Sequence, residues 1–238
     1  MRAAAVALFR EFPDHFVLFG GANLVLFHKS VRHSADLDLI AITQNRPKTE
    51  DIVAALRTGL AELAEVLKVN PLSFEAEVAD IPELKIHVNG SAGQRLFRVD
   101  FTKVGGVFDS EIEEQLVEAG PAAIHASVQY ASKALMLFRK AEAFLFRHVV
   151  KARDAYDIYQ LQSEGAALTE HLSQVLTDAM FGAEIEPEQI EERIQKMTVK
   201  RCQAELDGNL PVEIYDSLKK SEFAELQDAL RRLYEPWL

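Results

Sequence analysis

The spacing of hydrophobic and polar positions in the first hundred residues of the chain differs from the spacing in the rest. Short apolar runs between turn residues predict strands at residues 15–19, 35–42, 72–79, 83–88 and 94–102. Apolar residues at helical spacing predict helices between these strands, at residues 2–12, 21–29 and 49–68. From residue 111 onward the spacing predicts helices alone, over 111–118, 126–146, 149–163, 168–181, 187–205, 211–218 and 220–234.

This change in the spacing of hydrophobic residues predicts two domains in an α+β protein. Gly120 and Pro121 are strong breakers of regular structure and mark the expected boundary. We therefore expect a mixed sheet with flanking helices in residues 1–119 and a C-terminal helical lobe in residues 120–238.

The composition is typical of a globular protein with a substantial core, since 48% of the 238 residues are hydrophobic. Cys202 is the only cysteine, so no disulfide can form within the chain, and a reducing cytoplasm is the expected compartment. The apolar stretch before Arg10 has no cleavage site after it and predicts an amphipathic helix, not a signal peptide. No apolar run has the length of a membrane span, so no membrane partner is expected.

The formal net charge of −11 argues against a protein that binds nucleic acid through an overall positive charge. Two groups of basic residues still offer local positive surface: Arg139, Lys140, Arg147, His148, Lys151 and Arg153 in one, and Arg193, Lys196, Lys200 and Arg201 in the other. Each group fits an ordinary solvated helix face as well as it fits a binding surface.

Candidate chemistry is concentrated in residues 16–41. An apolar run ends at Gly20 and Gly21, and a second apolar run contains Asp36 and Asp38. Strand side chains alternate, so the two carboxylates lie on one face, about 7 Å apart. Two such carboxylates repel each other in a half-buried strand unless a cation lies between them. A hard divalent ion, most naturally Mg2+ carrying a nucleotide phosphate, resolves that conflict.

The pattern of two glycines, fourteen residues and D-x-D resembles the opening motif of the DNA polymerase β-type nucleotidyltransferases. With Arg32-His33-Ser34 before the aspartates, it resembles the AbiEii/AbiGii branch, the nucleotidyltransferase toxins of toxin–antitoxin and abortive-infection systems. Later pieces match in order: Asp100 in the strand 95–101, Lys133 in a helix, and the helical run Lys151–Tyr159. The resemblance covers roughly residues 12–165.

The resemblance implies a role for each matching residue. Catalytic residues would be Asp36, Asp38, Asp100, Lys133 and Asp154; metal ligands would be Asp36, Asp38 and Asp100; nucleotide contacts would be Gly20, Gly21, Asn23, Arg32, Ser34, Lys133 and Asp157. Many relatives have a hydroxyl residue at or just after the second glycine, whereas Ala22 and Asn23 follow here. Backbone N–H groups at a helix start can still bind phosphate.

What the resemblance implies is a minimal nucleotidyltransferase core that, with Mg2+ or Mn2+, moves a nucleotide from a nucleoside triphosphate to an acceptor. The acceptor would be RNA, such as a tRNA end, or a protein hydroxyl, the nucleotide would bind between the two lobes, and a cognate antitoxin would be a partner. Two alternatives stay open: a catalytically degenerate protein that binds nucleotide or a partner, and a helical interaction protein that matches D-x-D by chance. The nucleobase, the acceptor, the role of residues 166–238 and the oligomeric state cannot be read from the sequence.

Overall fold

The computed structural model describes residues 1–42, 47–77, 83–102 and 109–238. These residues form two compact units. The first unit contains Met1–Lys29 and Ser34–Ser132, and the second contains Ser30–His33 and Lys133–Leu238. The division therefore falls after Ser132, thirteen residues beyond the expected end of the first domain at residue 119, and the short segment Ser30–His33 belongs to the second unit.

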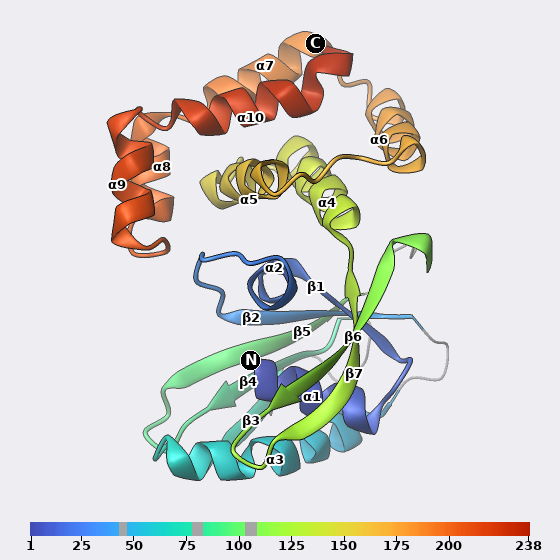
Figure 1. The fold of residues 1–238 in the computed structure, drawn as a ribbon, viewed down its shortest axis with the longest axis vertical. Helices are drawn as coiled ribbons and strands as arrows, with labels where there is room; N and C mark the ends of the chain where they lie inside the picture. The colour runs from blue at the N-terminus through green and yellow to red at the C-terminus, as the bar shows by residue number, and fades with distance from the viewer. Residues whose placement is uncertain (43–46, 78–82, 103–108) are drawn as a thin grey trace. The chain divides into compact units, whose positions relative to one another are not determined.

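The first unit is built on a mixed sheet (Figure 1). Its strands in the described residues are β1 (Phe16–Phe19), β2 (Asp36–Ala41), β3 (Ser73–Ala76), β4 (Lys85–Asn89), β5 (Arg95–Thr102), β6 (Ile112–Ala119) and β7 (Ile124–Ala131). They are ordered β3-β4-β5-β2-β1-β7-β6, with β2 parallel to β5 and β1 parallel to β7. The predicted α+β class with a mixed sheet is confirmed.

One face of this sheet forms the core of the first unit. Leu37 and Leu39 of β2 and Val99 of β5 are fully buried in a cluster with residues of α1 (Arg2–Glu11) and α3 (Thr49–Val66). The two helices approach closely, since a Cβ built on Gly59 would lie 2.2 Å from the Cβ of Ala7. Because strand side chains alternate, the residues between these apolar ones point to the opposite face. Helix α2 (Gly20–Phe27) packs against β1 and β2.

The predicted helix at 111–118 is wrong, and so is the start of the one at 126–146. Strands β6 and β7 form an antiparallel hairpin there, with the predicted boundary residues Gly120 and Pro121 in its turn. Gly120 has a φ of +78°, a conformation that glycine adopts without strain. On β7, buried Ala126, Val128 and Tyr130 alternate with polar residues, which is the period of a strand.

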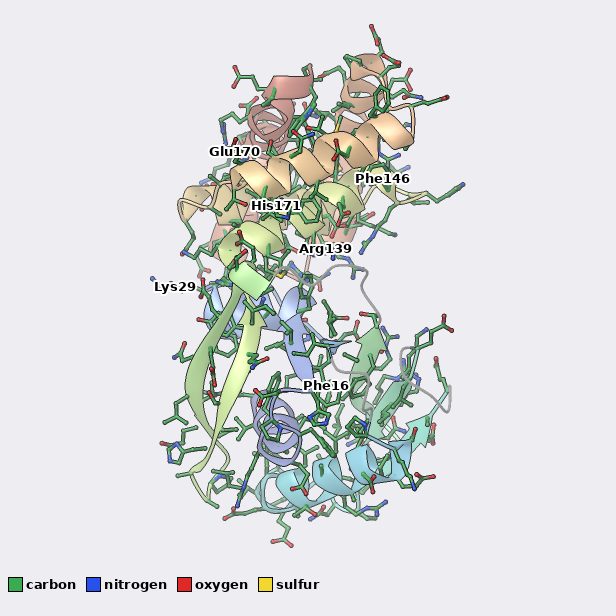
Figure 2. The ribbon with its side chains drawn as sticks, turned by 90° about the vertical axis from the view of Figure 1, so that its right-hand side faces the viewer. Phe16, Lys29, Arg139, Phe146, Glu170 and His171 are labelled. Carbon is green, nitrogen blue, oxygen red and sulfur yellow. The ribbon has the colours of Figure 1, made fainter. Side chains whose placement is uncertain are left out.

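The second unit is helical, as the spacing predicts. Its described helices are α4 (Lys133–Phe146), α5 (Ala152–Ser163), α6 (Glu170–Gly182), α7 (Pro187–Gln195), α8 (Val199–Leu206), α9 (Val212–Lys220) and α10 (Ala224–Tyr234). Helix α4 packs against α5 and α6, and Figure 2 labels Arg139 on α4 and His171 on α6. The predicted helix 187–205 is divided in two because the hydroxyl of Thr198 accepts a hydrogen bond from the Arg201 N–H and starts α8. Within the described parts of the chain, no helix has the length and apolar character needed to cross a bilayer.

Candidate active site

Three aspartates of the first unit lie on one face of two neighbouring parallel strands. Asp38 of β2 and Asp100 of β5 are Cα partners in the parallel register. Asp36 stands two residues before Asp38 on β2 and shares its face. The side chain of Asp100 is 12% exposed and that of Asp36 is 41% exposed. Asp100 is therefore nearly buried, whereas Asp36 is accessible to solvent. The register thus brings together carboxylates that are more than sixty positions apart in the sequence.

The first glycine of the motif leaves room for the carboxylate of Asp38. Gly20 starts α2 with a φ of +66°, which other residues adopt only with strain. A Cβ at this position would lie 1.8 Å from Oδ2 of Asp38 and 2.6 Å from its Cγ. The backbone of Gly20 therefore lies against the Asp38 side chain at a distance that no larger residue permits.

Arg98 of β5 bridges two of the three aspartates. Its Nε lies 2.5 Å from Oδ1 of Asp100, and its Nη2 lies 3.4 Å from Oδ2 of Asp36. The close ion pair with Asp100, together with the neighbouring carboxylates, raises the pKa of Arg98, so the guanidinium stays charged. The sequence analysis missed this residue. Arg98 could have been recognised because it lies two residues before Asp100, which places both side chains on one face of a strand.

The polar face continues onto β4, where the sequence analysis also missed two residues. His87 is the Cα partner of Arg98, and Lys85 is the Cα partner of Asp100. The ring Nε2 of buried His87 lies 2.5 Å from Oε1 of Glu77. This hydrogen bond holds the pKa of Glu77 below its ordinary value. Charged and polar side chains thus extend from β2 across β5 to β4.

Two other predicted nucleotide contacts of the first unit have partners within the unit. Asn23 is fully buried in α2, and its Nδ2 donates a hydrogen bond of 2.9 Å to the carbonyl of Ala131 at the end of β7. This bond ties α2 to the sheet. The hydroxyl of Ser34 donates a long hydrogen bond of 3.4 Å to the carbonyl of Asp36, which shapes the entry into β2. Gly21, the second glycine, is the next residue of α2.

Arg32, Asp154 and Asp157 belong to a buried ion-pair network in the second unit. The guanidinium of Arg32 makes a two-pronged contact with Asp157, at 2.9 and 3.1 Å. Nζ of Lys140 lies 2.7 Å from Asp157 and 3.1 Å from Asp154, and Arg147 lies 2.8 Å from Asp154. Both aspartates are fully buried. In the sequence, Arg32 and Asp157 are 125 positions apart, so this network fixes the segment Ser30–His33 on the helices.

The charges of this network shift the pKa values of its members. Burial alone would raise the pKa of Asp157, but the charges and hydrogen bonds of Lys140 and Arg32 outweigh it and hold that pKa below its ordinary value. Burial alone would lower the pKa of Lys140, but Asp157 and Asp154 outweigh it and raise that pKa. These pKa shifts keep Asp157 and Lys140 charged around neutral pH.

We expect the chain to lose stability in acid partly through Asp157. Its folded pKa lies below its unfolded pKa, so its contribution is present above the unfolded value of about 4 and is lost as the pH falls through the folded value. Urea unfolding between pH 7 and pH 3 measures this contribution. The variant Asp157→Asn is expected to show a shallower loss over this range, and parallel curves for the two proteins would contradict the assignment.

Lys133 and the two basic groups also have partners in the second unit. Lys133 opens α4, and its Nζ donates to Oε2 of Glu164 at 3.0 Å. Its side chain is 36% exposed. In the basic groups, Lys140 and Arg147 form ion pairs in the buried network. Arg193 and Arg201 donate hydrogen bonds to backbone carbonyls in the last turn of α4 and in the connection to α5. These four residues therefore have a structural use.

The donor set of the sheet face suits a magnesium or manganese ion. Asp36, Asp38 and Asp100 offer carboxylate oxygens, which are the ligands that such ions prefer. In the part of the chain that the structure describes, no three His, Cys, Asp or Glu side chains already converge as metal ligands. The guanidinium of Arg98 contacts Asp36 and Asp100, so two of the three carboxylates already have a cationic partner. The three carboxylates are suitable ligands for the ion once Arg98 no longer contacts Asp36 and Asp100.

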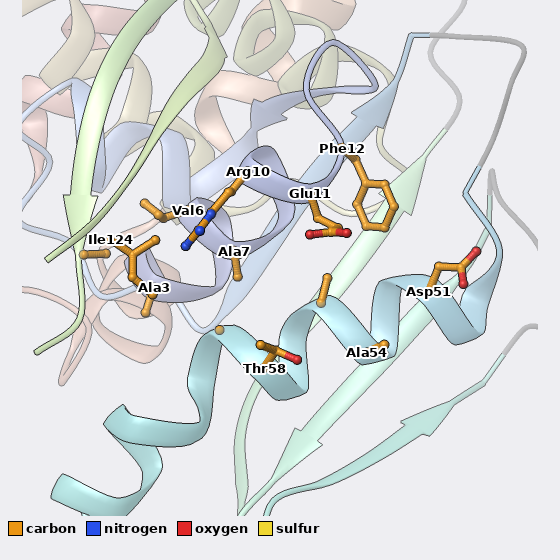
Figure 3. A pocket seen from close by; sticks show the side chains of 13 residues that line it. Ala3, Val6, Ala7, Arg10, Glu11, Phe12, Asp51, Ala54, Thr58 and Ile124 are labelled. Atoms are coloured by element: carbon orange, nitrogen blue, oxygen red, sulfur yellow. The ribbon is translucent and has the colours of Figure 1, made fainter. Parts of the chain in front are cut away.

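A well-defined cavity lies elsewhere in the first unit. It has a volume of about 450 Å³ and lies between α1 and α3 (Figure 3). Its lining includes the small residues Ala3, Ala7 and Ala54, and it contains none of the predicted site residues. Small side chains on two facing helices leave this space, so we do not assign the active site to it.

Comparison with known families decides the assignment. The family model for the AbiEii nucleotidyl transferase toxin of type IV toxin–antitoxin systems matches residues 5–235. The chain belongs to the AbiEii nucleotidyltransferase family. The predicted family and the predicted enzyme class are thereby confirmed, and membership implies a nucleotide substrate and a cognate antitoxin. No curated protein matches the chain in sequence.

Two solved structures from Helicobacter pylori share the fold of this AbiEii protein. One is classed as a nucleotidyltransferase, and it matches with a TM-score of 0.56 and 12% identity over 100% of this chain and 92% of its own. The other, JHP933, matches with a TM-score of 0.55 and 14% identity over 100% of this chain and 90% of its own. At such low identity the likeness establishes the fold alone, and it assigns no role to an individual residue.

Proposed function

We propose that this protein transfers a nucleotide from a nucleoside triphosphate to a hydroxyl acceptor, with Mg2+ or Mn2+ held by Asp36, Asp38 and Asp100. The observation that supports this proposal is the parallel pairing of Asp38 with Asp100 beside the backbone of Gly20. Bound divalent ions would lower the pKa of the attacking hydroxyl and neutralise charge on the pyrophosphate leaving group.

The residues of the chain would divide the remaining work. Asp100, the least exposed of the three aspartates in the sheet, would orient the acceptor hydroxyl and take up its proton. Gly20 would keep the Asp38 carboxylate in place, since its backbone lies directly against it. Lys133, whose ammonium is partly exposed, would exchange Glu164 for a phosphate oxygen.

For the acceptor we propose RNA, with the hydroxyl of a tRNA end as the first choice, and for the compartment the cytoplasm. A net charge of −11 favours a small basic contact area over a broad one. Arg153 and His148 of the first basic group are exposed and are available for such a contact.

A label-transfer assay tests this function. Purified protein with Mg2+ and each of the four labelled nucleoside triphosphates should label cellular RNA and release pyrophosphate. Asp38→Asn should reduce transfer at least about a hundredfold, the scale on which the loss of one group that stabilises a transition state is felt. Without metal, its melting temperature should be unchanged or higher, because one of two facing carboxylates is neutralised. Asp216→Asn, an exposed carboxylate on α9, is the matched control and should keep full activity.

A catalytically degenerate nucleotide-binding protein is the second candidate. It is favoured by the lack of a hydroxyl residue directly after Gly21 and by the ion pairs of Arg98 with two of the predicted metal ligands. The same assay separates the two functions. If the protein binds nucleotide in a metal-dependent manner but labels no RNA and no protein with any of the four triphosphates, the binding function replaces the transfer function.

A further inference from the structure

Arg98 contacts two of the three aspartates on the sheet face. Its guanidinium joins Asp100 at 2.5 Å and Asp36 at 3.4 Å, and its side chain is 28% exposed. A guanidinium and a divalent ion cannot share the same two carboxylates without strong repulsion, because both are positive and would lie a few ångströms apart. Binding of metal at these aspartates therefore requires Arg98 to move.

We propose that Arg98 is a built-in counter-cation of the aspartate group that exchanges Asp36 and Asp100 for a phosphate group of the nucleotide when metal binds. This proposal rests on the proposed function and adds to it a residue that binds substrate. Arg98 would stabilise the carboxylates against one another before metal arrives. It would then contribute to binding of the triphosphate, whose negative charge would replace that of the carboxylates beside the guanidinium.

The chemistry and the surroundings of Arg98 support this exchange. The planar guanidinium binds two oxygens of one phosphate at once, as it binds carboxylates. Its contact with Asp36 is long and involves a carboxylate that is 41% exposed, so solvent weakens this contact and little is lost when it breaks. Arg98 and the three aspartates lie on the same face of β2 and β5, so the guanidinium would remain beside a nucleotide held there.

The proposal predicts opposite effects of Arg98→Met on two ligands. Binding of Mn2+ alone, followed by electron paramagnetic resonance, should become at least about tenfold tighter, because no positive charge has to be displaced. Binding of inorganic tripolyphosphate at saturating Mn2+, followed by calorimetry, should become about tenfold weaker, because the phosphate loses a two-pronged partner. If Arg98 only stabilised the fold, Arg98→Met would shift the affinities for Mn2+ and for tripolyphosphate in the same direction.

Two further variants complete the test. Arg98→Lys keeps the charge and should leave the affinity for Mn2+ close to that of the wild type, which keeps the proposal testable if Arg98→Met unfolds. Arg95→Met makes the same change at an exposed position of the same strand and should alter neither affinity. If the wild type binds Mn2+ and Arg98→Met binds it equally or more weakly, the exchange is overturned and the proposed function stands. If neither the wild type nor any variant binds Mn2+, the proposed function fails, and the proposed exchange fails with it.

Discussion

Gly20→Ala is expected to abolish metal binding and to lower the free energy of unfolding by about 2–4 kcal/mol. Two effects add at this position. Alanine at a φ of +66° is strained, and its Cβ would lie 1.8 Å from Oδ2 of Asp38, so the carboxylate has to leave its place. Urea unfolding measures the first loss and Mn2+ titration the second.

Gly93→Ala is the matched control for this substitution. Gly93 has a φ of +74°, but a Cβ built on it would meet nothing within 4 Å. It should therefore show only the backbone strain, about 1–2 kcal/mol, and keep the affinity for Mn2+. Equal losses of stability in the two variants, with metal binding retained in both, would show that Gly20 does not shape the Asp38 site.

Asp157→Ala is expected to destabilise the chain by about 3–5 kcal/mol, because it leaves Arg32 and Lys140 buried without their main counter-charge. The loss should be visible as a lower midpoint of urea unfolding. It should also release the segment Ser30–His33, which Arg32 holds on the helices, and so increase amide hydrogen exchange of these residues.

Asp216→Ala removes a carboxylate from an exposed position in the same helical unit and should change stability by less than about 0.5 kcal/mol. If Asp157→Ala falls in this range as well, the buried network does not stabilise the fold. In that case the nucleotide-binding role that the family resemblance implies for Asp157 would become the better explanation of the residue.

The sequence carried enough information to predict the strands that hold the aspartates. Leu37 and Leu39 alternate with Asp36 and Asp38, and Val99 precedes Asp100 in the same way, so the strand period of two is clear in both places. The structure has β2 at Asp36–Ala41 and β5 at Arg95–Thr102, within one residue of the predicted ranges.

The β6–β7 hairpin was missed because its first strand has almost no hydrophobic pattern. On β6, three of the first four residues are acidic or amide side chains, and only Val117 and Ala119 are buried. Such a strand is stabilised by pairing with β7 rather than by its own burial, and pairing cannot be read locally. The alternation of Ala126, Val128 and Tyr130 was a readable signal, but a helix that truly begins at Lys133 was extended across it.

The motif predicted the carboxylates of the site but not their charged neighbours. Arg98 binds Asp36 of another strand, and His87 lies beside Arg98 on a third. These contacts depend on the register of the sheet, which single-sequence patterns do not fix. Arg32 and Asp157 were predicted as nucleotide contacts from the resemblance. They are 125 positions apart in the sequence, so the ion pair between them became visible only in three dimensions. The roles assigned to these residues in catalysis remain predictions.

Titration of Mn2+ into the wild type and into Asp36→Asn, Asp38→Asn and Asp100→Asn tests the central claim most directly. If the three aspartates form one metal site, each variant should lose at least about tenfold in affinity, since each removes one anionic ligand. Glu77→Gln, which changes a carboxylate beside His87 on the same sheet, should keep the affinity of the wild type. Wild-type affinity in both Asp38→Asn and Asp100→Asn would contradict the claim and place any metal-dependent chemistry elsewhere in the protein.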